Sequence, residues 1–360
     1  SRNGLNRMDP ETEKIKSYFH DYRNPKSISN NHVTCLFQDS YGVFWIGTKD
    51  KVNQYHPENG TFTKYGHTNK NTSLSNDDIY SFYEDNAGNI WIGTFKGVNK
   101  YDRNSSKFTL YARSSDDPQT LSNNIVYSIW KDPEGLIWIA TAQGLNILDR
   151  ETGHYHLLHH KFDEINDLAN EKIRIIKQDH AGIFWIGTEN HGLFRYDKNT
   201  GKFRQYKNDP KNPNSLVSNG VLFIIESKQH KLWIGTNNGL SIFDPRTNVF
   251  LNYQNDPKDN SSLSNNRIWQ IYEDRQGKMW VSTTNGLNLY KDHNGSFTRF
   301  KYDPDDPTSI SSDKIFSVYQ DKKGSYWIGT MGGGLNLYNP EKESFRSFTE
   351  KDGLPNNVVY

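Results

Sequence analysis

The chain has 360 residues, in which 43 lysines and arginines balance 42 aspartates and glutamates, leaving a formal net charge of +1. This near-neutrality excludes the general attraction to nucleic acid or anionic lipid that strongly basic proteins use, and no run approaches the 18 apolar residues of a membrane-spanning helix. Aromatic residues make up 14% of the chain, which favours a folded core despite a mean hydropathy of −0.89, and the single cysteine, Cys35, excludes an internal disulfide and a cysteine-based zinc site.

One internal repeat organises the sequence. The tetrapeptide at residues 45–48, Trp-Ile-Gly-Thr, returns in exact or near form at spacings of 46, 47, 47, 48, 47 and 47 residues. This column contains seven of the nine tryptophans: Trp45, Trp91, Trp138, Trp185, Trp233, Trp280 and Trp327. Because tryptophan is rare, its recurrence in register establishes the repeat without an alignment.

Each unit predicts four short strands in a fixed order. The first strand, such as residues 126–130, is apolar or aromatic at nearly every position, which is typical of a strand buried on both faces. An Asp-x-x-Gly turn such as Asp39–Gly42 leads to the tryptophan strand. A third strand opening with Gly-Leu and a fourth with an aromatic pair, such as Phe62 and Tyr65, complete the unit. Proline-containing connectors follow, because proline does not fit a strand ladder.

Four antiparallel strands per unit of about 47 residues indicate an all-β fold, a β-propeller of four-stranded blades with the tryptophans between blades. We expect residues 27–352 to form seven blades, residues 1–26 a half-blade of third and fourth strands, and residues 353–360 the first strand of a following blade. The alternative is an eight-position ring, in which the N-terminal half-blade pairs with the C-terminal strand.

The repeat resembles the two-component regulator propeller repeat, known from the periplasmic sensor regions of hybrid two-component sensor histidine kinases of Bacteroidetes. The resemblance is carried by Ile271-x-x-Asp274-x-x-Gly277-x-x-Trp280 and by Trp327-Ile328-Gly329-Thr330 followed by Gly334-Leu335. It covers nearly the whole chain. Local departures include Ser227 and His230, where the other units usually have Asp and Gly.

The resemblance implies a periplasmic, non-catalytic sensor module that binds a glycan-derived oligosaccharide and controls a kinase outside these residues. It also implies further propeller and immunoglobulin-like domains in the same protein, which we expect to be a homodimer. No cofactor is implied, and we expect neither nucleic-acid binding nor membrane insertion by these residues. The alternatives are a protein-docking or dimerisation scaffold and, with weaker support, a propeller lyase or glycosidase. No pair of acidic residues stands out for the two-carboxylate chemistry that a glycosidase requires.

Candidate ligand residues are those that depart from the repeat near the connections expected to open on one face, around a central channel. Aromatic side chains there suit stacking on a sugar ring, and charged ones suit hydrogen bonds to hydroxyls. Arg174 is the one cation in its first-strand column, where burial without a partner is costly. The candidates are Phe95, Lys96, Arg174, Glu189, His191, Arg267, Trp269 and Met331. No metal site is expected, because the histidines at 154, 156, 159 and 160 lie on an edge strand without a carboxylate cluster.

Overall fold

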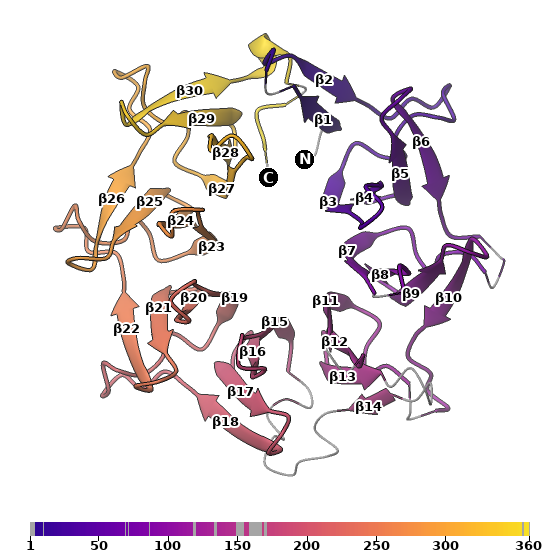
Figure 1. Cartoon of the computed structure of the whole chain (residues 1–360), viewed down its shortest axis with the longest axis horizontal. Coiled ribbons are helices and arrows are strands. Elements are labelled where there is room, and N and C mark those ends of the chain that lie inside the picture. The colour runs from indigo at the N-terminus through magenta and orange to yellow at the C-terminus, as the bar shows by residue number, and fades with distance from the viewer. Residues whose placement is uncertain are drawn as a thin grey trace. The chain divides into compact units, whose positions relative to one another are not determined.

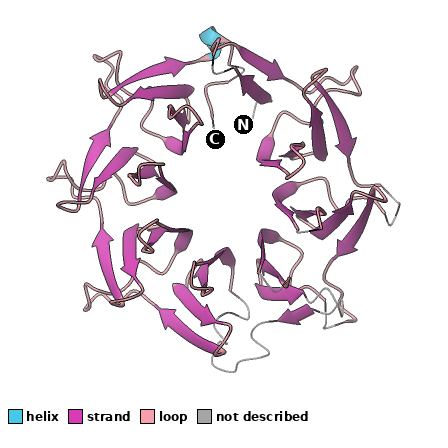
Figure 2. Cartoon of the chain, in the orientation of Figure 1, coloured by secondary structure: helices cyan, strands magenta, loops and turns pink. Residues whose placement is uncertain are grey.

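The computed structural model describes residues 4–9, 11–68, 70, 72–85, 87–117, 120–132, 135–148, 155–157, 168, 171–354 and 356–359. They form two compact units, Ser1–Met8 with Lys16–Ile176 and Asp9–Ile15 with Lys177–Tyr360. Strands provide nearly all the regular structure of the described residues, as Figure 2 shows, together with the short 3-10 helix η3 (Glu350–Asp352). We describe each unit by itself.

The first unit contains a two-stranded sheet, except for its residue Ile15, and three four-stranded sheets, with neighbours in the sequence paired side by side (Figure 1). The strands are β1 (Leu5–Met8) and β2 (Ile15–Tyr18); β3 (Val33–Gln38), β4 (Phe44–Thr48), β5 (Val52–His56) and β6 (Thr61–Tyr65); β7 (Ile79–Glu84), β8 (Ile90–Thr94), β9 (Gly97–Asp102) and β10 (Lys107–Tyr111); and β11 (Val126–Lys131), β12 (Ile137–Thr141), β13 (Gly144–Leu148) and β14 (Tyr155–Leu157).

Four more sheets follow the same order. Their strands are β15 (Ile173–Gln178), within which the boundary between the units falls, β16 (Phe184–Thr188), β17 (Leu193–Asp197) and β18 (Lys202–Tyr206); β19 (Val221–Glu226), β20 (Leu232–Thr236), β21 (Gly239–Asp244) and β22 (Val249–Tyr253); β23 (Ile268–Glu273), β24 (Met279–Thr283), β25 (Gly286–Lys291) and β26 (Ser296–Phe300); and β27 (Ile315–Gln320), β28 (Tyr326–Thr330), β29 (Leu335–Asn339) and β30 (Ser344–Phe348). These seven four-stranded antiparallel sheets are the predicted propeller blades.

The repeated tryptophans pack between successive blades, as predicted. Trp45 on β4 meets the ring of Tyr101 on β9 at a centroid distance of 5.4 Å, and Trp233 on β20 meets Tyr290 on β25 at 4.9 Å. Trp45 is only 1% exposed. In these pairs the indole therefore fills the space between its own sheet and the next, and the core continues from blade to blade within a unit.

The turn aspartate holds the tryptophan as well as the turn. In the sixth blade, the Asp274 carboxylate accepts hydrogen bonds from the Trp280 indole N–H at 3.1 Å and from the Lys278 amide at 2.8 Å. The same indole bond joins Trp45 to Asp39, Trp91 to Asp85, Trp138 to Asp132, Trp185 to Asp179 and Trp327 to Asp321. The Asp-x-x-Gly motif is thus both a turn signal and an anchor for the core.

A buried polar network fixes the connector to its own blade in five of the blades. In the first blade, Ser29 and Asn53 exchange two hydrogen bonds of 2.8 Å, and the Ser29 hydroxyl lies 3.0 Å from that of Thr48. Equivalent Ser–Asn pairs join Ser75 to Asn99, Ser122 to Asn146, Ser264 to Asn288 and Ser311 to Asn336. Because these buried groups satisfy one another, the repeated polar residues cost little to bury.

A second recurring link joins neighbouring blades. The amide that opens each third strand donates to a carbonyl just before the first strand of the next blade, for example Gly97 to Asn124 at 2.7 Å and Gly239 to Asn266 at 2.8 Å. The same link runs from Gly4 to Asn31 and from Gly334 to Asn357. The segments on either side of the seven blades therefore use the same contacts as the blades.

The sheet of β1 and β2 leaves part of the first blade uncovered. Leu36 is 60% exposed and Phe44 41%, whereas their counterparts in the sixth blade, Ile271 and Met279, are 2% and 5% exposed. Both line an apolar cavity of about 480 Å³ beside β1. Whether the blades close as a seven-bladed or an eight-position ring stays a prediction.

Candidate ligand-binding site

Two sets of connections meet at one end of each blade, which we call the loop end. The first residue after the tryptophan strand donates its amide to the carbonyl just before the first strand, as in Phe95 to Asp78 at 3.2 Å and Met331 to Lys314 at 2.8 Å. The Asp-x-x-Gly turns lie at the opposite end of the same strands, which we call the turn end. This placement agrees with the expected arrangement of the connections.

A β-bulge reshapes the first strand at the loop end. In the sixth blade Ile268 pairs with Thr283 and Gln270 with Ser282, so Trp269 is an extra residue without a partner in the ladder. The same register shift occurs in six blades, and the bulged residues are Thr34, Tyr80, Tyr127, Leu222, Trp269 and Phe316. A bulge redirects a side chain out of the regular pleat. The bulge therefore turns the side chains of this column, most of them aromatic, out of the regular pleat at the loop end.

Cations lie over these rings. In the first unit, the Lys49 ammonium is 5.0 Å from the centroid of Tyr80, and the Arg174 guanidinium is 5.5 Å from that of Tyr127. In the second unit, the Arg267 guanidinium is 5.1 Å from the Trp269 ring. Such pairs are attractive because the face of an aromatic ring carries negative charge.

Charge pairing holds one of these groups in place. Lys49 also forms a 2.8 Å ion pair with Asp78, and this hydrogen bond is the main cause that raises the pKa of Lys49. Burial is the largest of the effects that raise the pKa of Tyr80, whose hydroxyl donates to Asp78 at 3.3 Å. At neutral pH this corner therefore presents the ammonium of Lys49 and the neutral phenol of Tyr80.

The predicted candidates divide between the units. Phe95, Lys96 and Arg174 belong to the first, where Phe95 is 46% exposed and Lys96 is exposed in the same loop. Arg174 is half-buried on β15 against Tyr127. Arg174 thus has an aromatic partner, Tyr127, that could not be expected from the sequence.

The remaining candidates lie in the second unit. Arg267 and Trp269 come together, and Trp269 makes an edge contact with Phe316 of the next blade at 5.3 Å. The loop candidates are half-buried or exposed there: Glu189, His191 and Met331, the last being 37% exposed. The His191 amide donates to Thr188, and its carbonyl accepts from Gln205 at 2.9 Å, so this loop is fixed by its backbone.

Several residues at this end were not among the candidates. Lys49, Tyr80, Lys172, Tyr127 and Phe316 take part in the ring contacts. The available signal was the aromatic character of the first strands, which predicts burial on both faces. Of the histidines weighed for metal binding, those at 154, 159 and 160 lie outside the described residues, as does the side chain of His156.

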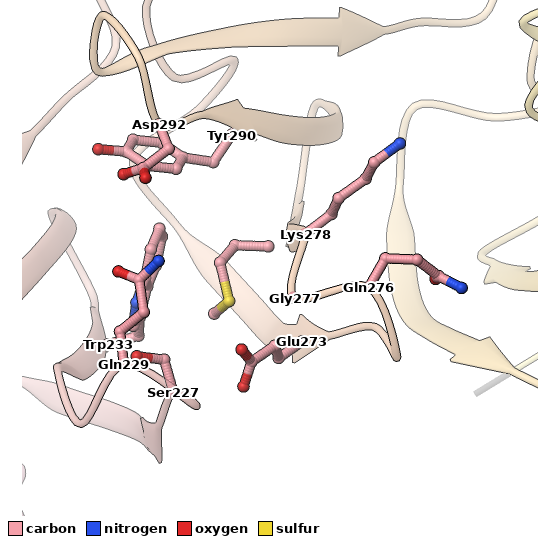
Figure 3. Close-up of a pocket in the computed structure, with 10 residues that line it drawn as sticks. Ser227, Gln229, Trp233, Glu273, Gln276, Gly277, Lys278, Tyr290 and Asp292 are labelled. Carbon is pink, nitrogen blue, oxygen red and sulfur yellow. The ribbon is translucent and has the colours of Figure 1, made fainter.

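A cavity at the turn end of the fifth and sixth blades is a weaker candidate. It encloses about 200 Å³ and is lined by residues that include Ser227, Trp233, Glu273 and Asp292. In Figure 3, Lys278 and Gln276 point away from Trp233. The Glu273 carboxylate accepts the Lys228 amide at 3.0 Å, so it already serves a link between blades. The cavity is smaller than the roughly 300 Å³ of the smallest common ligand pockets.

No helix among the described residues has both the length and the apolar character needed to cross a membrane. A comparison with curated proteins found no match. Among solved structures, the chain is similar to the extracellular domain of a proposed one component system, BT4673, from B. thetaiotaomicron, with 20% identity and a TM-score of 0.50, covering 99% of this chain and 53% of that one. It is also similar to PorZ, a surface component of the type-IX secretion system of Porphyromonas gingivalis, with 14% identity, a TM-score of 0.55 and coverage of 99% and 53%.

The chain spans about half the length of these structures, and at these identities the likeness shows the fold. The family model described as two component regulator propeller matches residues 27–50, 73–96, 262–285 and 309–332. Each match runs from a connector through the first strand and the tryptophan strand into the following loop, so it contains the motif that recurs seven times. Four of the seven blades therefore contain a segment that matches the two-component regulator propeller repeat.

Proposed function

We propose that this chain is the periplasmic, ligand-sensing propeller of a hybrid two-component sensor histidine kinase. It binds an oligosaccharide derived from a glycan at the loop end of its blades, without catalysing a reaction, and binding controls the kinase. The observation that carries the proposal is the column of bulged aromatic residues with cations over their rings.

The chemistry of this column suits a sugar. The C–H faces of a sugar ring stack on aromatic faces, and its hydroxyl groups exchange hydrogen bonds with charged and polar neighbours. Trp269 is 42% exposed, with Arg267 beside it, so the indole and the guanidinium offer both kinds of contact. The near-zero net charge of the chain suits an uncharged ligand better than a polyanion.

The family supports the signalling part of the proposal. The matched repeat takes its description from two-component regulators, and one of the similar folds is the extracellular domain of a proposed one component system. A propeller placed ahead of a kinase acts as its input, which requires binding and no turnover. The loop-end carboxylate of Asp78 is engaged by Lys49, which argues against its use as a glycosidase acid.

The test is calorimetric titration of the purified chain with a panel of glycan-derived oligosaccharides, with chromatography of the same mixtures to detect products. We expect binding without turnover, and at least a tenfold loss of affinity in Trp269→Ala or in Phe316→Ala, whose rings are in contact, since aromatic anchors dominate such sites. Tyr41→Ala is the matched control, because Arg103 lies 4.6 Å from the Tyr41 ring at the turn end.

Product formation would contradict the sensor assignment. Binding that survives both loop-end substitutions unchanged would remove the proposed site. Silence across a broad panel would favour a docking or dimerisation scaffold, which light scattering coupled to size-exclusion chromatography would reveal as a stable dimer.

A further inference from the structure

Two histidines, of which His230 departs from the repeat, share one carboxylate at the turn end of the second unit. His180 follows the turn aspartate after β15, and His230 lies in the turn between β19 and β20. Glu226 is the last residue of β19. At the position of His230, the other six blades have glycine: Gly42, Gly88, Gly135, Gly182, Gly277 and Gly324.

The backbone of His230 makes this departure notable. Its φ of 59° lies in the left-handed region, which glycine adopts freely and a histidine does not. The fold therefore carries a side chain where glycine is the easier choice. Residues kept in such conformations cluster at functional sites.

The three side chains converge on one point. The Nδ1 atom of His230 lies 3.2 Å from Oε1 of Glu226, and Nδ1 of His180 contacts the same oxygen. The two imidazole rings stack with their centroids 3.6 Å apart. The ligand atoms of the three residues all lie within 4.8 Å of one another.

Comparison with other blades separates the structural role of Glu226 from this arrangement. Its Oε2 atom accepts the His180 amide at 2.9 Å, and the same link between blades joins the Ser40 amide to Glu84 and the Arg275 amide to Gln320. In those two links the residue after the turn aspartate is a serine or an arginine. The hydrogen bond from the turn amide to the next blade thus recurs in other blades, whereas the two imidazoles beside Glu226 do not belong to this recurring link.

We propose that His180, Glu226 and His230 bind a divalent transition-metal ion, for which Zn²⁺ is the best match. Two imidazole nitrogens and a carboxylate oxygen are a common zinc donor set, with bonds of about 2.0–2.2 Å that place neighbouring tetrahedral ligands roughly 3.4 Å apart. The 3.2 Å between His230 and Glu226 is close to this separation. Side-chain exposures of 51% for His180 and 53% for His230 leave room for water or an external ligand on the ion.

The ion would join the turns of two successive blades. His180 comes from one blade, and Glu226 and His230 from the next, so binding requires both turns in their folded positions. An ion that binds only the folded state raises the apparent stability in proportion to the logarithm of its concentration. The site therefore acts as a metal-dependent clip at the turn end, independent of the sugar site proposed at the loop end.

The experiment is calorimetric titration of the tag-free chain with ZnCl₂ near neutral pH, together with thermal unfolding with and without the ion. We expect one Zn²⁺ per chain and a rise in melting temperature. His230→Gly, His180→Ser and Glu226→Gln should each weaken binding at least tenfold, because each removes a ligand. Co²⁺ should give a visible absorption band in the wild type that these variants lack.

Two control variants distinguish the loss of a specific metal site from misfolding and from nonspecific binding. His230→Gly restores the residue of the other blades at a positive φ, so without metal it should unfold at or above the wild-type temperature. His293→Ala removes an exposed histidine from another turn and should leave binding unchanged. Zn²⁺ binding of the same strength in His230→Gly, or no binding by the wild type at about 1 mM Zn²⁺, would overturn the proposal.

Discussion

Replacing Asp274 by alanine tests how much the buried turn aspartate contributes to the stability of its blade. This side chain is 1% exposed, and its carboxylate accepts four hydrogen bonds: from the Trp280 indole at 3.1 Å, the Tyr326 hydroxyl at 2.7 Å, and the Gln276 and Lys278 amides at 3.0 and 2.8 Å. Each buried donor that loses its acceptor costs about 1–3 kcal/mol. Because the two amides lie in a turn that water reaches, we expect a total loss of about 3–5 kcal/mol.

Urea unfolding followed by tryptophan fluorescence and circular dichroism measures this loss. Asp274→Ser should be milder, because Ser227 occupies the equivalent position in the fifth blade and accepts the Lys231 amide at 3.3 Å. Exposed Asp303→Ala is the control and should cost less than about 1 kcal/mol. A loss below about 1 kcal/mol for Asp274→Ala, or no coupling between it and Trp280→Phe in a double-mutant cycle, would refute the assigned role of the carboxylate.

Three further predictions follow from individual environments. Phe44 and Phe184 open equivalent strands but are 41% and 0% exposed. Phe184→Ala should therefore lower the free energy of unfolding in urea by about 3–5 kcal/mol and Phe44→Ala by about 1–2 kcal/mol. Equal losses of stability would contradict this. Burial opposes the charge of Asp39, but hydrogen bonds from Arg103 and Trp45 outweigh it and lower the pKa of Asp39. The stability that charged Asp39 contributes is present above its unfolded pKa of about 3.9 and is lost as pH falls through its folded pKa. The urea midpoint should therefore fall when the pH drops below about 4, and it should fall less in Asp39→Asn. An equal fall in the variant would contradict this. Burial raises the pKa of the Cys35 thiol to about 11, so at pH 8 a disulfide reagent should modify it on the order of 100-fold more slowly in the folded chain than in urea, and equal rates would count against the burial.

The strand order and the core were predictable because both follow from short-range patterns. The column of Trp45 and its counterparts marks the second strand, and a run such as residues 126–130 marks a first strand buried on both faces. The hydrogen bond from the Trp45 indole to Asp39 could also have been predicted. Asp and Trp keep a spacing of six residues in every repeat except the fifth, where Ser227 replaces Asp.

The site was less predictable for a physical reason. In a strand that is apolar or aromatic at nearly every position, alternation gives no register, so the bulge at Trp269 leaves no mark in the sequence. The contact of Arg174 with Tyr127 joins different blades, and its geometry depends on how the sheets stack. His180 and Glu226 lie 46 residues apart, close to one repeat, so aligning the units would have placed both at the turn end, but not their shared oxygen.

The link from Gly97 to Asn124, and its equivalents along the chain, reaches only the next blade. Each four-stranded repeat therefore contacts the next one through the same few contacts, wherever it lies in the chain. Duplicating or deleting one whole unit would preserve those contacts at every junction, whereas a change of half a unit would break them at two. The unit of about 47 residues is thus the natural step by which such a protein lengthens or shortens in evolution, and the step that an engineer would use to transplant a loop-end binding surface.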